Sequence, residues 1–117
     1  MQALDSAKLL SERDPDGSAS RAYYAAFYSV CAHFALEGKT FAKHSAVRAS
    51  VHNDLVKSGL WEEELGAAYS YLMRLRYAGD YGGFVHVSAG DSAKAVQLAS
   101  RILEAVHKLH PDVFSMD

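Results

Sequence analysis

The sequence predicts an all-α protein: an antiparallel four-helix up-and-down bundle with an extra short helix in the connection between the second and fourth helices. Two observations carry this prediction. Apolar residues recur at spacings of three and four in each regular segment, and no stretch alternates apolar and polar residues as a strand would. Residues 18–38 are also apolar around most of the circumference of a helix, so this helix needs neighbours on several sides.

The first and second helices are separated by a short turn. Residues 3–10 form an amphipathic helix that stops near Arg13, before the turn residues 14–17. Ser18 or Asp16 can cap the second helix, and Gly38 marks its end. One stripe of this central helix is large and apolar, and the stripe beside it consists of alanines and serines that permit close helix packing. The members of the two stripes are Tyr23, Phe27, Val30 and Phe34, and Ala22, Ala25, Ala26, Ser29 and Ala32.

The remaining helices follow from the same periodicity. A third, short helix begins at His44 or Ser45 and ends at residues 58–59, and a fourth runs from Trp61 to about Ala78. The glycine-rich stretch 79–90 predicts a loop. Ser88, with an acidic residue three positions later, has the pattern of a helix cap and opens the last helix, which ends before Pro111.

Composition indicates one ordinary domain, residues 1–117. Half of the 117 residues are hydrophobic and 22% are charged, which suffices for a single core. The net charge of -2 argues against a surface that binds nucleic acid all over, although it allows a local basic patch. Cys31 has no second cysteine to pair with, and we expect it to be a small buried hydrophobe. Without a long apolar run, we expect a cytoplasmic protein with no membrane association.

The ends of the second and fourth helices supply the candidate binding residues. If these helices are antiparallel neighbours, Arg21 and Tyr24 lie at the same end of the bundle as Arg76 and Asp80. Arginine side chains hold phosphate through two hydrogen bonds, and tyrosine rings such as Tyr81 stack on bases. With His44 at the start of the third helix, these residues predict a shallow cleft for a phosphate and a base, shared between two protomers.

Two other interpretations of these residues stay open. In the first, Arg76 and Asp80 pair at a helix end and Tyr81 fills a gap, so the group is structural, and Arg21 is an ordinary surface residue. In the second, Arg76 stabilises charge while His44 or His86 transfers a proton, which would allow metal-independent RNA cleavage.

No metal or cofactor is expected. His44 and His52 are eight positions apart and His107 and His110 three, and the sequence has neither an HExxH motif nor a Cys-His zinc pattern. A glycine-rich phosphate loop is absent as well, because the glycines after Ala78 neither follow a strand nor precede a GK[ST] sequence.

Three segments, in this order, resemble the HEPN domain family of small prokaryotic helical proteins: SRAYYAAFYSV, KHSAVRASVHNDLVKSG and LRYAGDYGG. The resemblance covers nearly the whole chain. It implies a helical bundle that forms homodimers, is often encoded beside a minimal nucleotidyltransferase, and acts on RNA or binds nucleotides in toxin-antitoxin and defence modules.

The chain departs from the nuclease branches of this family, which carry an arginine and a histidine four to six residues apart near the end of the helix before the last. The residues four and five positions after Arg76 are Asp80 and Tyr81, and the first histidine after Arg76, His86, is too distant to match that spacing. The resemblance therefore favours a nucleotide- or RNA-binding module that partners a nucleotidyltransferase, without a catalytic residue. A metal-independent endoribonuclease and a dimeric scaffold without ligand are the alternatives.

Overall fold

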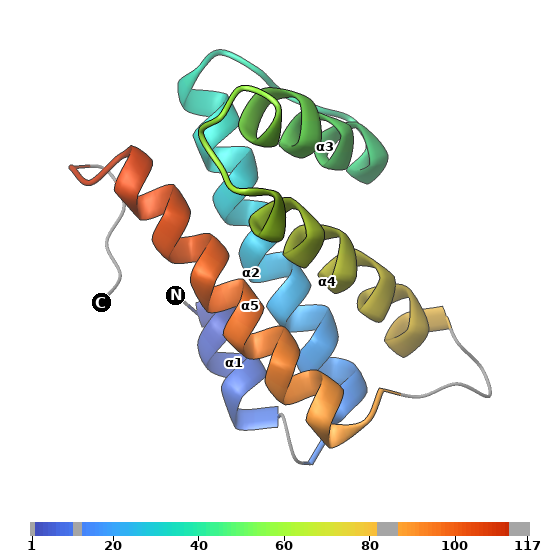
Figure 1. Cartoon of the computed structure of the whole chain (residues 1–117). Coiled ribbons are helices and arrows are strands. Elements are labelled where there is room, and N and C mark those ends of the chain that lie inside the picture. Colours follow the sequence, from blue (N-terminus) through green and yellow to red (C-terminus); the bar gives the residue numbers. More distant parts are fainter. Residues whose placement is uncertain (1, 11–12, 82–86, 113–117) are drawn as a thin grey trace.

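The computed structural model describes residues 2–10, 13–81 and 87–112, and every regular element in these ranges is helical. The elements are α1 (Gln2–Leu10), α2 (Pro15–Leu36), α3 (His44–Ser50), the π-helix η1 (Val51–Val56), α4 (Glu63–Tyr81) and α5 (Ala89–Leu109). Figure 1 shows their arrangement. The all-α prediction is therefore confirmed, and the extra short helix lies between α2 and α4, continued by η1. Within the described residues, no helix is long and apolar enough to cross a membrane.

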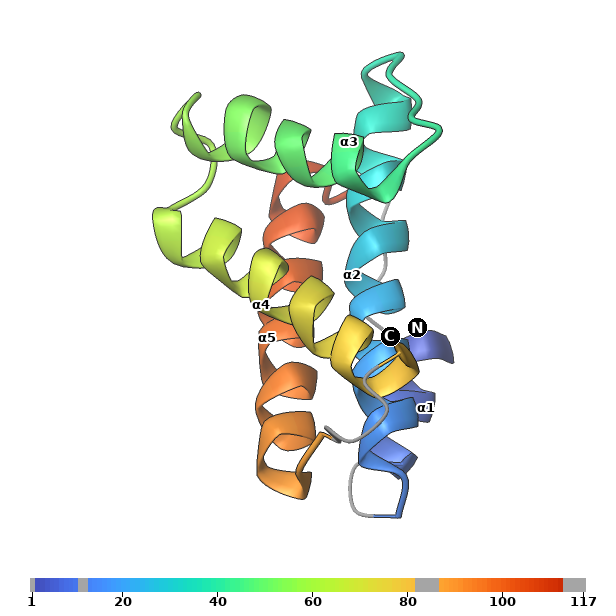
Figure 2. The ribbon, with the colours of Figure 1, turned by 90° about the vertical axis from the view of Figure 1, so that its right-hand side faces the viewer.

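Helix α2 lies at the centre of the fold and contacts α1, α4 and α5. Its large residues Tyr23, Val30 and Phe34 are fully buried, and most of its small stripe is buried as well. In Figures 1 and 2, α1 and α4 run opposite to α2, whereas α5 runs in the same direction as α2. Because α2 and α5 are in contact, the packing is not antiparallel between every pair of neighbours. Together α3 and η1 lie crosswise beside the C-terminal half of α2 (Figure 2).

The start of α2 differs from the expected one. The helix begins at Pro15, and the cap is Asp14, whose carboxylate accepts a hydrogen bond from the Gly17 backbone N–H at 3.0 Å. Proline suits the first position of a helix, where its missing N–H is not needed and its fixed φ is already helical. The sequence Pro-Asp-Gly thus forms the first turn of α2, and not a separate turn before it.

The two residues expected to cap α2 make tertiary hydrogen bonds. The Ser18 hydroxyl donates to the Ala7 carbonyl oxygen at 2.6 Å, which fixes α1 against α2 in the core. The Asp16 carboxylate accepts from the Val87 backbone N–H at 2.7 Å, so the start of α2 holds the chain just before α5. Both bonds need a partner remote in sequence, which local patterns do not reveal.

The other boundaries lie close to the expected ones. Gly38 follows the end of α2 with φ of +79°, a conformation that glycine adopts without steric cost. Ser88 caps α5 as predicted, because its hydroxyl accepts from the Asp91 backbone N–H at 3.0 Å. Helix α4 extends to Tyr81, past the expected end at Ala78. Cys31 packs against the core but is half-buried, and not fully buried as predicted.

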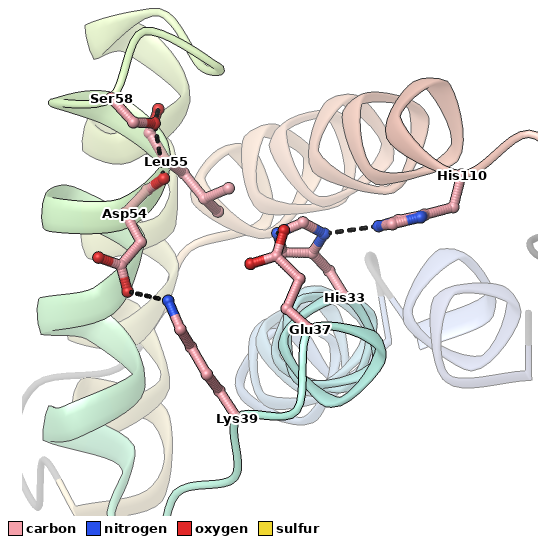
Figure 3. A network of polar contacts seen from close by, with 7 residues as sticks. All are labelled: His33, Glu37, Lys39, Asp54, Leu55, Ser58 and His110. Carbon is pink, nitrogen blue, oxygen red and sulfur yellow. Dashed lines mark hydrogen bonds and ion pairs between the residues drawn. The ribbon is translucent and has the colours of Figure 1, made fainter.

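Polar contacts hold the C-terminal end of α2, as Figure 3 shows. His33 is buried and its Nδ1 lies 2.8 Å from Nε2 of His110, the residue that caps the C-terminus of α5. Burial is the main cause that lowers the pKa of His33, against the opposing effect of Glu37. Beside them, Lys39 Nζ lies 3.2 Å from an Asp54 carboxylate oxygen and ties the segment after α2 to η1.

The π-helix packs closely on α4 at Gly66, which is buried. A Cβ atom at this position would lie 2.8 Å from a Val56 methyl group and 3.1 Å from the His52 ring. His52 Nε2 also lies 2.9 Å from the Ser70 hydroxyl, one helical turn further along α4. Glycine is therefore required by the approach of η1, and not by the helix.

We predict that Gly66→Ala destabilises the protein and that Gly90→Ala stabilises it. Alanine improves helix propensity at both sites by up to about 1 kcal/mol. At Gly66 the crowding of Val56 and His52 should outweigh this gain, with a net loss of about 1–2 kcal/mol. At Gly90 the nearest atom to an added Cβ is 3.8 Å away, so the gain remains. Thermal melting of both variants is the measurement, and a higher melting temperature for Gly66→Ala would contradict the close packing.

Candidate functional site

The candidate site is built around Arg76, an arginine of α4 that is only 8% exposed. Its guanidinium carbon lies 5.5 Å from the ring centroid of Tyr23, 5.2 Å from that of Tyr24 and 5.2 Å from that of Tyr77. Aromatic faces attract cations at such distances, and the attraction grows as water is excluded. The rings thus compensate part of the cost of burying a charge where α4 crosses α2.

His44 joins this group from the first position of α3. Its ring stacks on Phe27 with a centroid distance of 4.3 Å and an interplanar angle of 16°. Its Nδ1 lies 2.6 Å from the Tyr23 hydroxyl, so the two side chains share a hydrogen bond. The extended backbone of Lys43 brings the chain into α3 and sets His44 against α2. Helices α2, α3 and α4 therefore meet at Tyr23.

Among the described residues of the site, Arg76 carries the positive charge. Burial lowers the pKa of His44, and the nearby Arg76 charge lowers it further. Burial raises the pKa of Tyr23, which outweighs the opposing effect of Arg76. At neutral pH the site therefore combines a guanidinium cation, a neutral imidazole and a neutral phenol.

The outer side of the site is aromatic and accessible. Tyr24 is half-buried and stacks on Tyr28, with a centroid distance of 5.8 Å and an interplanar angle of 30°. Tyr28 is 57% exposed and Tyr77 is 48% exposed, which is unusual for such large rings. We call the whole group the aromatic cluster: Tyr23, Tyr24, Phe27, Tyr28, His44, Arg76 and Tyr77. It offers a floor with a buried cation and exposed rings around it.

The structure brings together three of the six residues expected at the site: Tyr24, His44 and Arg76. Arg21 is exposed and donates a hydrogen bond to the Gly17 carbonyl oxygen of its own helix at 3.2 Å, as a surface arginine does. Its guanidinium is therefore held by the preceding turn of α2, and none of its contacts with the described residues places it in the cluster.

The other expected residues cannot be placed in the cluster. The side chains of Asp80 and Tyr81, at the end of α4, and the whole of His86 lie outside the described residues.

Four residues of the cluster are not among those that the sequence predicts for the site: Tyr23, Phe27, Tyr28 and Tyr77. The sequence pattern places Tyr23 and Phe27 in the core, which is correct for the buried Tyr23, but their contacts with His44 also make them part of the site. Two features of the sequence point to the others. Tyr24 and Tyr28 are four residues apart and lie on one face of α2, and Tyr77 directly follows Arg76.

The described residues contain no group of three or more histidine, cysteine or acidic side chains that could hold a metal ion. The histidines considered as pairs have other neighbours: His44 contacts Tyr23, His52 contacts Ser70, and His110 contacts His33.

We predict that His44 makes the folded state less stable as the pH falls. Its pKa in the folded state is lowered below the unfolded value of about 6.5, so below that pH the unfolded chain binds more protons and is favoured. An NMR titration of the His44 ring should show the low pKa directly. Arg76→Met should raise it, because the positive neighbour is lost, whereas Arg21→Met should leave it unchanged. An unchanged value in Arg76→Met would contradict the proposed coupling.

Comparisons with known proteins assign the family. The model of the HEPN domain family matches residues 2–109. A UPF0332 protein of Thermotoga maritima is 37% identical over 113 residues, which cover 96% of this chain and 86% of that protein. No solved structure matches the chain significantly. The match includes α2, α3 and α4, from which the aromatic cluster is built. The chain belongs to the HEPN domain family.

Proposed function

We propose that this HEPN domain is a nucleotide- or RNA-binding module and that the aromatic cluster is its binding site. The observation that carries the proposal is the position of Arg76, whose guanidinium lies among three tyrosine rings. Tyr77, one of these rings, and Tyr28, which stacks on Tyr24, are about half exposed. Exposed aromatic rings accept unpaired bases, and a guanidinium group holds phosphate. A binding site for a base and a phosphate needs both features within a few ångströms of each other.

In the proposed complex, a base stacks on the accessible ring of Tyr24 or Tyr77. Its phosphate approaches Arg76 between Tyr24 and Tyr77, where little water remains and the attraction is strong. The neutral state of His44 at neutral pH keeps the positive charge of the floor on Arg76. The net charge of the chain is slightly negative, so binding depends on this local cation rather than on a basic surface.

We predict that Arg76→Met weakens binding of ATP and of short single-stranded RNA by about 1.5–3 kcal/mol, the range for a hydrogen bond to a charged group. Methionine keeps much of the side-chain length and leaves the tyrosine rings packed. The control is Arg74→Met, because Arg74 is exposed and lies about 200° around the helix from Arg76. Titration calorimetry and thermal melting of the same samples separate the roles. If Arg76→Met melts at a lower temperature than the wild type and the wild type shows no saturable binding, Arg76 has only a structural role and the domain is a scaffold without ligand.

We also propose that the domain acts as a homodimer. Tyr28 is the most exposed ring of the cluster, and large exposed rings commonly mark protein interfaces as well as ligand sites. A twofold dimer packed through Tyr28 would place two clusters around one cleft, each protomer contributing a buried arginine.

We expect light scattering at micromolar protein to give the dimer mass, and Tyr28→Glu to reduce it to the monomer mass because a buried carboxylate opposes association. Leu9→Glu is the matched control, since Leu9 is 80% exposed on α1. A monomer mass for the wild type would remove the shared cleft from the proposal and leave the single-chain site.

The HEPN resemblance further suggests a minimal nucleotidyltransferase as the partner protein, within a toxin-antitoxin or defence pair. Such an enzyme uses nucleotides, which fits a domain that binds a base and a phosphate. Co-expression with the product of a neighbouring nucleotidyltransferase gene, followed by purification of the pair, tests this part. Absence of such a gene beside this one would count against it.

A metal-independent endoribonuclease is the second candidate function, and the proximity of His44 to Arg76 favours it. If the Nδ1–H of the neutral imidazole donates to the Tyr23 hydroxyl oxygen, Nε2 has a lone pair and would take the proton of the 2′-hydroxyl. The 2′-oxygen would then attack phosphorus, the bond to the 5′-oxygen would break, and the imidazolium would return the proton to that oxygen. Arg76 would stabilise the charge on the phosphorus oxygens. The products are a 2′,3′-cyclic phosphate and a 5′-hydroxyl.

If this reaction occurs, His44→Gln should lower RNA cleavage in the presence of EDTA by about 10²–10⁴-fold, the usual contribution of a general base. His52→Gln serves as the control, because His52 contacts Ser70 on α4 and not the cluster. A quenched fluorescent RNA provides the rate. Absence of cleavage by pure wild-type protein would reject the nuclease and leave the binding module.

A further inference from the structure

A long groove runs between α4 and α5, away from the aromatic cluster. It consists of two adjoining hollows of about 370 and 360 Å³ that share Glu64, Ala68, Leu98 and Arg101. The groove follows α5 from Lys94 to Leu109, which is about 22 Å at about 1.5 Å per residue. Arg74 lines the groove, and it lies about 200° around α4 from Arg76, so the two sites use opposite sides of that helix.

The groove has an apolar floor. Trp61, in the hollow that reaches Leu109, is almost fully buried, and Leu65, Leu98 and Ala105 are half-buried along the groove. Leu60, at the rim of the same hollow, is 53% exposed. Such a surface favours an occupant with apolar side chains in a row, since each contact removes apolar area from water.

Charges along the groove are unevenly distributed. Arg74, Lys94 and Arg101 line one hollow with a single acidic residue, Glu64. Within the described residues, no ion pair occupies these three cations. Lys94 instead lies over the ring of Tyr71, with its Nζ 4.6 Å from the centroid. The hollow lined by Arg74, Lys94 and Arg101 therefore attracts negatively charged groups of a ligand.

The other hollow carries three glutamates, Glu62, Glu64 and Glu104, against Arg101 and Lys108. Its excess of acidic groups would repel the backbone phosphates of a nucleic acid that followed the groove. A protein ligand with acidic residues at one end and neutral or basic residues at the other matches both halves.

We propose that the α4–α5 groove binds an amphipathic helix of a partner protein, with acidic residues of that helix facing Arg74, Lys94 and Arg101. A helix fits the length, because about 15 residues span about 22 Å. Its apolar stripe, with side chains at spacings of three and four, would lie along Trp61, Leu65, Leu98 and Ala105. A second copy of this chain fits less well, because two concave grooves facing each other would enclose empty space instead of packed side chains.

The experiment uses the full chain and a synthetic peptide of about 15 residues, with leucines at helical spacing, glutamates on one flank, and neither tryptophan nor tyrosine. Trp61 is the single tryptophan of the protein and lines the groove, so a change in its fluorescence reports binding at this place. We expect saturable binding of the acidic peptide and binding at least about tenfold weaker for the same peptide with lysines in place of the glutamates.

Two matched double variants test the cations. Arg74→Gln/Arg101→Gln should weaken the acidic peptide about 5–10-fold, because each exposed pair contributes a modest amount. Arg48→Gln/Lys57→Gln removes the same charge from exposed positions outside the groove and should change binding little. Equal effects of the two double variants would overturn the proposal, as would no saturation by about 1 mM peptide. Release of the peptide by single-stranded RNA would also overturn it, by assigning the cations to nucleic acid.

Discussion

The structure depends on the need to cover the apolar side of α2. The buried residues of this 22-residue helix occupy about half of its circumference, and three helices pack against it. This constraint also creates the site. Because α4 must cross α2 to cover it, Arg76 is carried onto the tyrosines of α2, and the connection through α3 brings His44 to Phe27. The same packing that builds the core thus assembles the aromatic cluster.

Much of the fold could be predicted from periodicity, because the stripes of α2 and α5 repeat over many turns. The cap at Ser88 was also predictable, since it involves a residue only three positions away. The start of α2 was not, because proline and glycine are common in turns and proline is also common at the first position of a helix. Ser18 and Asp16 were expected to cap α2, but they bond to Ala7 and Val87, partners that only the folded chain brings near.

The site was predictable in part for a related reason. The antiparallel course of α2 and α4 places Tyr24 near Arg76, and simple topology suffices for that. Which side of each helix turns inward depends on the crossing of the helices and on their rotation. Arg21 lies less than one turn before Tyr24 but points to solvent, and His44 reaches the cluster only because α3 lies crosswise. A rotation of a helix by a few tens of degrees decides which of its residues join the cluster, and the spacing of residues in the sequence does not fix this rotation.

The π-helix lets an otherwise peripheral segment hold one residue more than an α-helix would. Residues 44–56 form one continuous rod in which α3 directs His44 toward α2, while η1 directs His52 toward Ser70 and Gly66 of α4. A π turn holds about one residue more than an α turn, so loss of one residue from Val51–Val56 would let this turn become α-helical and leave the two ends in nearly the same rotation. Loss of a residue from the α-helical part would instead rotate one end against the other by about 100°. Chain length is therefore tolerated in η1 and constrained in α3, where a change would remove one histidine from its contacts.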